Sequence, residues 1–422
     1  NFIKELGILS DGKLRLGYGW NGNNRVGEFD SYSTITLPIS MSYPINNTPV
    51  RGAGPTSIGN SDLKWETTEE TNIGLDLGFL NNNITFVAEV YRKKTRDLLL
   101  QADLPPSSGY SAAFKNIGSV QNEGLELTLN TKNITRKDFQ WSTNFNIAFN
   151  RNKVLGLNEG QDHMLSQIRW DNNWQSVPAY IAKVGQPIGQ MYGFISDGVY
   201  QLSDFTDNGN GTYTLKADVT TNGNTRTNIK PGDIKYKDIT GDLNVNSSDY
   251  AVIGNGTPKH QGGLNNNFAY KGFDLNIFFQ WSYGNDVLNV NRLMFEGNGL
   301  NKAFLNQYAS YNDRWSIANQ QSGNFRTGGF FGGGYSSRYV EDASYLRLKT
   351  VSLGYNLPQV ILQKAKIRAA RVFVSGQNLV TWTKYTGMDP EVNTYMSALT
   401  PGFDWSAYPR AKTMVAGINL TF

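Results

Sequence analysis

The sequence predicts an all-β fold, an antiparallel transmembrane β-barrel to which this chain contributes roughly ten strands. Long segments alternate apolar and polar residues with a period of two, as residues 139–149 do, and such alternation places oily and wettable side chains on opposite faces of a strand. No stretch of about 18 apolar residues occurs, so no transmembrane helix is expected. Short and long connections follow one another along the chain, which is typical of barrels with short turns on one side of a membrane and long loops on the other.

The composition agrees with a protein that faces lipid on one side and water on the other. Hydrophobic residues make up only 39% of the chain, whereas aromatic residues reach 13% and glycine is present 44 times. The net charge of +4 is too small to indicate a nucleic-acid partner. Because the chain has no cysteine, disulfides, thiol chemistry and thiolate metal sites are excluded.

The strands follow from the alternation, taken in chain order. Aromatic residues such as Trp20, Trp141 and Trp281 lie near the ends of alternating segments, where the girdles at the two membrane interfaces are expected. A soluble antiparallel sheet with one buried face shows the same alternation, so that alternative stays open. The predicted strands lie near residues 12–20, 65–80, 84–98, 117–131, 137–150, 262–270, 273–285, 341–357, 369–383 and 411–422.

The connections between these strands fall into two classes. Tight connections are expected at 81–83, 132–137 and 271–272. The segment 358–368 is interpreted as another connection on the periplasmic side, with a helical turn from Val360 to Ala365. Long loops are expected at about 21–64, 151–261, 286–340 and 384–410. We interpret 151–261 as a long extracellular loop insert.

The first residues, Asn1-Phe2-Ile3-Lys4, do not resemble a signal peptide, so we expect an N-terminal portion to precede them. About ten strands in a sheet leave two open edges, and unpaired backbone at an edge is not stable in lipid. The remaining strands of the barrel are therefore expected outside this chain.

Several short motifs occur along the chain: Ser61-Asp62-Leu63-Lys64-Trp65-Glu66-Thr67, Lys93-Lys94-Thr95-Arg96-Asp97-Leu98-Leu99, Asn122-Glu123-Gly124-Leu125-Glu126, Tyr270-Lys271-Gly272-Phe273-Asp274-Leu275, Tyr345-Leu346-Arg347-Leu348-Lys349, Ser375-Gly376-Gln377-Asn378-Leu379 and Asp389-Pro390-Glu391. In this order they resemble the C-terminal half of SusC-type TonB-dependent transporters of Bacteroidota. The ending Gly417-Ile418-Asn419-Leu420-Thr421-Phe422 is similar to the insertion signal of outer-membrane barrels, with its terminal aromatic residue.

The resemblance implies a barrel of about 22 strands filled by an N-terminal plug. Residues 1–422 would be the C-terminal portion of that barrel, without the plug and the N-terminal strands. It also implies active import of nutrients, of the oligosaccharide or peptide class, across the bacterial outer membrane. The expected partners are outer-membrane lipid, a SusD-like lipoprotein, the TonB complex through the missing N-terminal part, and the sugar or peptide cargo.

Two other functions stay open at this point. A passive or structural outer-membrane barrel, as a subunit of a larger envelope complex, would have the same strand pattern. A soluble secreted β protein that binds glycans would share the alternation as well. A catalytic function is not expected, because His163 and His260 lie far apart outside any metal-ligand spacing and no nucleophile motif is present.

An Asp-rich segment in the long loop has the spacing of a calcium loop, in which a hard cation takes about six to eight oxygen ligands. We therefore predict a structural calcium ion as a possible cofactor. Leu243 stands where such loops usually carry glycine, and the last ligand is an aspartate rather than a glutamate. The candidate ligands are Asp238, Thr240, Asp242, Asn244, Asn246 and Asp249.

The same loop carries aromatic residues among asparagine and glutamine. Aromatic faces beside amides suit stacking on sugar rings together with hydrogen bonds to hydroxyl groups. The alternative is that these rings pack within the loop or belong to the outer aromatic girdle. The candidate ligand-binding residues are Trp170, Trp174, Tyr180 and Tyr192.

Overall fold

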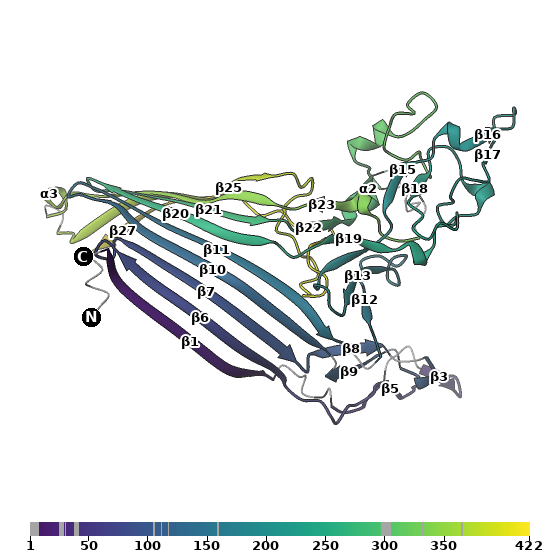
Figure 1. Cartoon of the computed structure of the whole chain (residues 1–422), viewed down its shortest axis with the longest axis horizontal. Coiled ribbons are helices and arrows are strands. Elements are labelled where there is room, and N and C mark those ends of the chain that lie inside the picture. The colour runs from purple at the N-terminus through teal and green to yellow at the C-terminus, as the bar shows by residue number, and fades with distance from the viewer. Residues whose placement is uncertain are drawn as a thin grey trace.

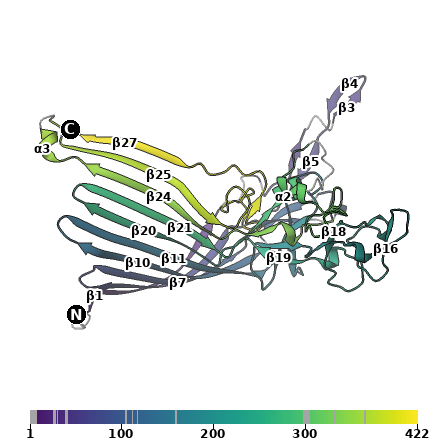
Figure 2. The same ribbon diagram turned by 90° about the horizontal axis from the view of Figure 1, so that it is seen from above.

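The computed structural model describes residues 8–24, 29, 31–37, 42–103, 106–110, 112–116, 118–157, 160–296, 305–330, 333–363 and 366–422. Its main feature is a broad, curved, antiparallel sheet of ten strands (Figures 1 and 2). In spatial order these are β1 (Leu9–Asn23), β6 (Glu66–Phe79), β7 (Ile84–Arg96), β10 (Ser119–Thr135), β11 (Phe139–Gly156), β20 (His260–Tyr270), β21 (Phe273–Tyr283), β24 (Tyr345–Asn356), β25 (Ala369–Thr383) and β27 (Thr413–Thr421).

Spatial order and chain order are the same in this sheet, so each strand pairs with the next long strand along the chain. Such up-and-down pairing is the connectivity of outer-membrane barrels. Each predicted strand coincides with one of these ten, and the predicted antiparallel barrel fold is confirmed. β1 and β27 are the edges of the sheet, so the sheet is open.

The connections segregate by length between the two ends of the sheet. Tight turns and α3 (Gln359–Leu362) lie at one end, together with the start of β1 and the end of β27 (Figure 1). The turn between β20 and β21 contains only Lys271 and Gly272, both with positive φ (44° and 89°), as a two-residue hairpin of type I′ requires. The predicted helical turn at 360–365 is present in part, and Ala365 lies outside the described residues.

The two faces of the sheet differ in chemistry. One face carries Leu16, Val90 and Leu353, which are 73%, 54% and 42% exposed. An apolar side chain of this size loses about 1.5–3 kcal/mol when it faces water instead of an apolar medium. A whole row of them is stable when it faces acyl chains, so this is the outward face of the barrel wall. Within the described part of the chain, no helix has the length and apolar character needed to span a bilayer.

The long connections at the other end fold into a body with cores of its own. It contains the four-stranded sheet β12 (His163–Gln167), β13 (Pro178–Lys183), β14 (Gln190–Gly193) and β19 (Ala251–Asn255); the pairs β15 (Ser196–Val199) with β18 (Ile234–Tyr236) and β16 (Phe205–Asp207) with β17 (Tyr213–Leu215); and the three-stranded sheet of β22 (Asp286–Asn289), β23 (Val340–Asp342) and β26 (Phe403–Asp404). The helix α2 (Val290–Phe295) packs with them.

Three further two-stranded sheets and several single turns complete the described structure. These sheets pair β2 (Thr34–Thr36) with β5 (Gly54–Ser57), β3 (Ser42–Ile45) with β4 (Thr48–Arg51), and β8 (Leu99–Asp103) with β9 (Ala112–Asn116). The 3-10 turns are η2 (Pro106–Ser108), η3 (Leu202–Asp204), η4 (Arg226–Asn228), η5 (Ser247–Asp249), η6 (Ala309–Asp313) and η7 (Ser337–Tyr339).

Candidate functional site

The inner face of the sheet is polar and is the first part of the candidate site. Because successive residues of a strand point to opposite sides, Arg15 and Glu89 face away from the outward apolar row. The Arg15 guanidinium lies 2.9 Å from Asp76 and 3.2 Å from Glu89. Asn72 donates a further hydrogen bond to Glu89. All of these groups are only half-buried, so they form a charged, wettable wall along the first strands.

Farther along the same face, asparagine side chains form a ladder across the strands. The Asn276 amide donates to the side-chain oxygens of Asn265 and Asn267, each at 2.7 Å. The Asn144 amide donates to Asn130. An amide both donates and accepts hydrogen bonds, so a wall of amides can bind hydroxyl or peptide groups of either polarity.

A buried charge cluster attaches one long loop to this wall. Arg347 on β24 lies 2.8 Å from Asp389 and 2.8 Å from Glu391, both in the loop after β25. Its Nε donates to the Thr381 hydroxyl at 2.9 Å, and Arg410 lies 3.1 Å from Glu391. The Arg347 side chain is only 2% exposed, so its bonds form away from bulk water, where charge-assisted hydrogen bonds are strong.

This cluster is not among the predicted site residues, although both motifs that form it are present in the sequence. Arg347 stands between Leu346 and Leu348, and its position in the alternation places it on the inner face. A charged residue on the inner face near a strand end was the available signal. The carboxylates that it binds, Asp389 and Glu391, lie about forty residues later, and no periodicity connects them with Arg347.

The structure places two of the predicted ligand-binding rings inside the loop body. Trp174 is 1% exposed and Trp170 is 9% exposed, and both belong to one hydrophobic core. The Trp170 indole donates to the Tyr335 hydroxyl at 2.7 Å, and the Trp174 and Tyr335 rings lie 4.7 Å apart. The faces of these rings contact protein, so they leave no surface for a sugar ring and act as packing residues in this structure.

The other two predicted rings differ from each other. Tyr180 is fully buried, and its hydroxyl donates to the Pro401 carbonyl at 2.9 Å, which joins two long loops. Burial raises the pKa of Tyr180 well above its ordinary value. Tyr192 is half-buried and meets the Tyr250 ring edge-on at 5.4 Å. Of the four, Tyr192 alone keeps partial access to solvent in the described structure, and ligand binding by it stays a prediction.

The Asp-rich segment forms a tight loop held by its own backbone. Asp238 accepts hydrogen bonds from the N–H groups of Gly241 (2.7 Å) and Leu243 (2.8 Å). Leu243 has a φ of 61°, the left-handed conformation that calcium loops normally assign to glycine at this place. Leu243 therefore adopts the left-handed conformation without being a glycine.

Asp249 closes this loop from the other end. Its fully buried carboxylate accepts hydrogen bonds from the N–H groups of Ile239 (2.9 Å), Thr240 (3.0 Å) and Asn246 (2.8 Å). Burial opposes ionisation, but these hydrogen bonds outweigh it and lower the pKa of Asp249. Asp242 accepts from the Asn244 N–H at 2.8 Å.

No group of three or more histidine, cysteine, aspartate or glutamate side chains is placed to hold a metal ion in the part of the chain that the structure describes. The carboxylates of this loop are already bound to backbone N–H groups. Cation binding by Asp238, Thr240, Asp242, Asn244, Asn246 and Asp249 therefore stays a prediction of the sequence.

Comparison with known proteins decides the family. The model described as TonB dependent receptor-like, beta-barrel matches residues 10–228. The chain belongs to the TonB-dependent receptor β-barrel family. This membership confirms the predicted location in the bacterial outer membrane and confirms that the chain is not an enzyme.

Individual relatives of this TonB-dependent receptor barrel support the same conclusion. TonB-dependent receptor P3 of Formosa agariphila is 34% identical over 429 residues, and TonB-dependent receptor SusC of Bacteroides thetaiotaomicron is 32% identical over 437 residues. Both alignments cover 100% of this chain but only 40% and 38% of the relatives. The chain thus spans about two fifths of their length, and the predicted SusC resemblance is confirmed.

Solved structures of the family agree with the fold. The structure of the RagAB peptide transporter matches 98% of this chain and 41% of its own chain, with a TM-score of 0.77 and 26% identity. The RagAB peptide importer in the closed-closed state matches with a TM-score of 0.78 over 100% of this chain and 42% of its own.

Proposed function

We propose that the protein to which this chain belongs imports a polar nutrient oligomer across the outer membrane, driven by TonB. The observation that carries the proposal is the division of one sheet into an oily outer face and an amide-rich inner face, with a folded body of loops above it. A lipid-facing wall around a polar interior is the arrangement that a solute path needs.

Further strands are part of the proposal. The edges of the sheet, β1 and β27, expose unpaired backbone groups, and each such group costs several kcal/mol in hydrocarbon. Closure by additional strands removes that cost. We expect those strands, together with a plug that fills a barrel of this width, in the rest of the protein.

The proposed cargo is an oligosaccharide or a peptide. The inner wall offers donor and acceptor amides beside arginine–carboxylate pairs, and both kinds of oligomer carry the groups that such side chains bind. Three of the matches point in the same direction, since one is named SusC and two are RagAB structures described as a peptide transporter and a peptide importer. A SusD-like lipoprotein over the loop body is the partner that we propose.

Uptake by cells tests the proposal. Cells that express the full-length protein are offered labelled oligosaccharides and labelled peptides, with and without a protonophore that dissipates the proton gradient. We expect uptake of one class, which the protonophore abolishes. Uptake that continues at the same rate after dissipation would indicate the passive barrel instead, and uptake of neither class would refute import of these nutrients.

A further inference from the structure

A group of cations lies on the outward face of the sheet, beyond the apolar row and toward the long loops. Side chains of alternate residues share a face. On the outward face, the residues that follow Val90 and Phe149 toward the long loops are basic. Glu69 and Glu123 are the acidic residues on the same face of this region. The cations are Arg92, Lys94 and Arg96 on β7, and Arg151 and Lys153 on β11.

Only part of this positive charge is neutralised within the chain. Arg92 lies 3.6 Å from Glu123, and Arg96 lies 3.5 Å from Glu69. Among the described residues, no carboxylate lies within ion-pair distance of Lys94, Arg151 or Lys153. The outward face therefore carries a net positive charge at the loop-side end of the strands, where the apolar row ends.

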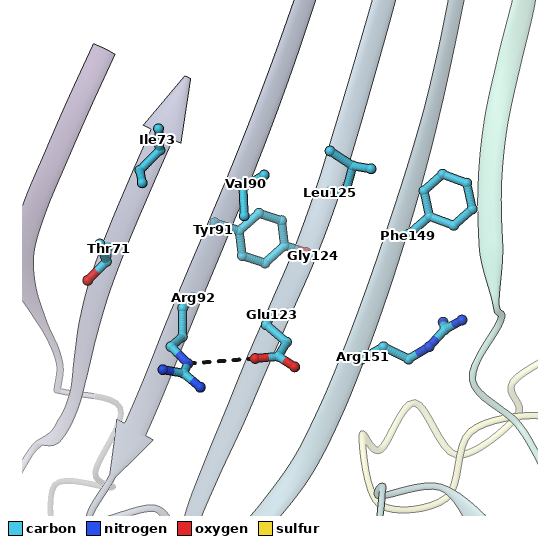
Figure 3. Close-up of a pocket in the computed structure, with 10 residues that line it drawn as sticks. All are labelled: Thr71, Ile73, Val90, Tyr91, Arg92, Glu123, Gly124, Leu125, Phe149 and Arg151. Atoms are coloured by element: carbon cyan, nitrogen blue, oxygen red, sulfur yellow. Dashed lines mark ion pairs between the residues drawn. The ribbon is translucent and has the colours of Figure 1, made fainter. Parts of the chain in front are cut away.

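Arg92 and Arg151 flank a hollow on this face, shown in Figure 3. The hollow has a volume of about 540 Å³. Its apolar floor is formed by Ile73, Val90, Leu125 and Phe149, and Glu123 lies between the two arginines (Figure 3). The floor continues the oily row that faces acyl chains, and the two guanidinium groups stand at its loop-side end.

We propose that this hollow binds a phosphorylated lipid of the outer leaflet. Its acyl chain would lie on the apolar floor, and its phosphate would accept hydrogen bonds from Arg92 and Arg151. The planar guanidinium group presents paired N–H donors that match phosphate oxygens. The Arg92–Glu123 pair is long and exposed, so an anion displaces little there. The Arg151 guanidinium donates from Nη1 to the carbonyls of Asn150 (3.1 Å) and Lys259 (2.9 Å), and its remaining N–H groups are left for a phosphate.

The position along the barrel axis supports a lipid head group over a free anion. Long loops mark the extracellular end in barrels of this family's type, so the cations stand at the outer-leaflet interface. Free phosphate would leave the apolar floor uncovered. A phosphorylated lipid would cover the apolar floor with its acyl chain and would place its phosphate beside the two arginines.

Binding of a defined lipid to the full-length protein in detergent tests the proposal. The probes are lipid A with both phosphates, the same lipid after enzymatic removal of the phosphates, and inorganic phosphate alone. The variants are Arg92→Gln/Arg151→Gln and the matched control Arg136→Gln/Lys137→Gln, which removes two exposed charges at the opposite end of the same sheet. Native mass spectrometry counts bound lipid and also shows whether a second protein copy is present.

We expect the phosphorylated lipid to bind the parent protein and the control alike. It should bind the Arg92→Gln/Arg151→Gln variant at least about tenfold more weakly, because the phosphate loses both of its charge-assisted hydrogen-bond partners. The dephosphorylated lipid should bind all forms weakly. The same concentration of inorganic phosphate should leave the lipid in place.

Equal binding by the parent and the arginine variant would overturn the proposal, as would displacement by inorganic phosphate. A protein dimer that only the arginine variant loses would show that a second copy occupies the face instead. If the arginine variant does not fold, Arg151→Gln/Lys153→Gln replaces it. Both of these side chains are exposed and without a carboxylate partner in the described structure, so their loss removes no ion pair.

Discussion

The Arg347 guanidinium on β24 forms a buried ion pair with Asp389, 2.8 Å away in the loop that follows β25. Glu391 and Arg410 extend the pair into a four-member cluster of alternating charge. The loop from 384 to 412 is thus attached to the inner wall of the barrel through this cluster.

Replacing Arg347 with leucine should release that loop. Removal of one partner from a buried pair leaves the carboxylates of Asp389 and Glu391 poorly compensated, which costs roughly 3–5 kcal/mol. We expect hydrogen exchange of residues 387–393, which adjoin Asp389 and Glu391, to become fast in the full-length protein while the barrel strands and β26 stay protected. Lys384→Gln, an exposed change in the same loop, is the control. Unchanged exchange in Arg347→Leu would show that other contacts hold the loop.

Trp174 should matter for the stability of the loop body and not for contact with cargo. Its ring is 1% exposed and packs against Trp170, Phe330 and Tyr335. Truncation to alanine leaves a large cavity, which costs about 3–5 kcal/mol. We expect proteases to cut the loops of Trp174→Ala far faster than those of the parent.

Tyr408→Ala is the matched control, since that ring is 92% exposed and its loss leaves no cavity. A Trp174→Ala protein that resists proteolysis yet loses cargo would contradict the packing role. That outcome would restore the interpretation of Trp174 as a stacking residue.

The sequence predicts the barrel wall because lipid on one side and water on the other impose a period of two on every strand. The same sequence does not predict the loop body. Trp170 meets Tyr335 at a separation of 165 residues, and the Tyr180 hydroxyl meets Pro401 at 221. Such contacts leave no local pattern, so rings that pack the interior of a loop and rings that stack on a ligand have the same appearance in the sequence.

Asp249 should make the stability of its loop depend on pH. Its folded pKa is lowered, so the ionised carboxylate stabilises the folded loop above the unfolded pKa of about 3.9. This contribution is lost as the pH falls through the lower, folded value. We expect Asp249→Asn to lower the hydrogen-exchange protection factors of residues 239–250 at neutral pH. Acidification through the folded pKa should lower the same protection factors in the parent, each measured relative to the slower intrinsic exchange at that pH.

Asp242→Asn is the control, because Asp242 is exposed and receives a single backbone hydrogen bond. Slow exchange in Asp249→Asn at neutral pH would contradict the proposed role of the carboxylate. The same measurement with a chelator tests the predicted cation. Faster exchange of this loop in the parent after chelation would indicate a bound calcium ion.

Gly272 should be needed for the two-residue turn between β20 and β21. Its φ of 89° is unfavourable for any residue with a Cβ, and a Cβ there would lie 3.1 Å from the Asn356 carbonyl oxygen on the neighbouring strand. Gly272→Ala should therefore lower the unfolding free energy of the barrel by roughly 1–3 kcal/mol. Gly19→Ala is the matched control, since a Cβ on that glycine meets no atom within 4 Å. Urea unfolding of the full-length protein in lipid vesicles measures both variants, and an equal midpoint for the two would show that the turn accepts alanine without strain.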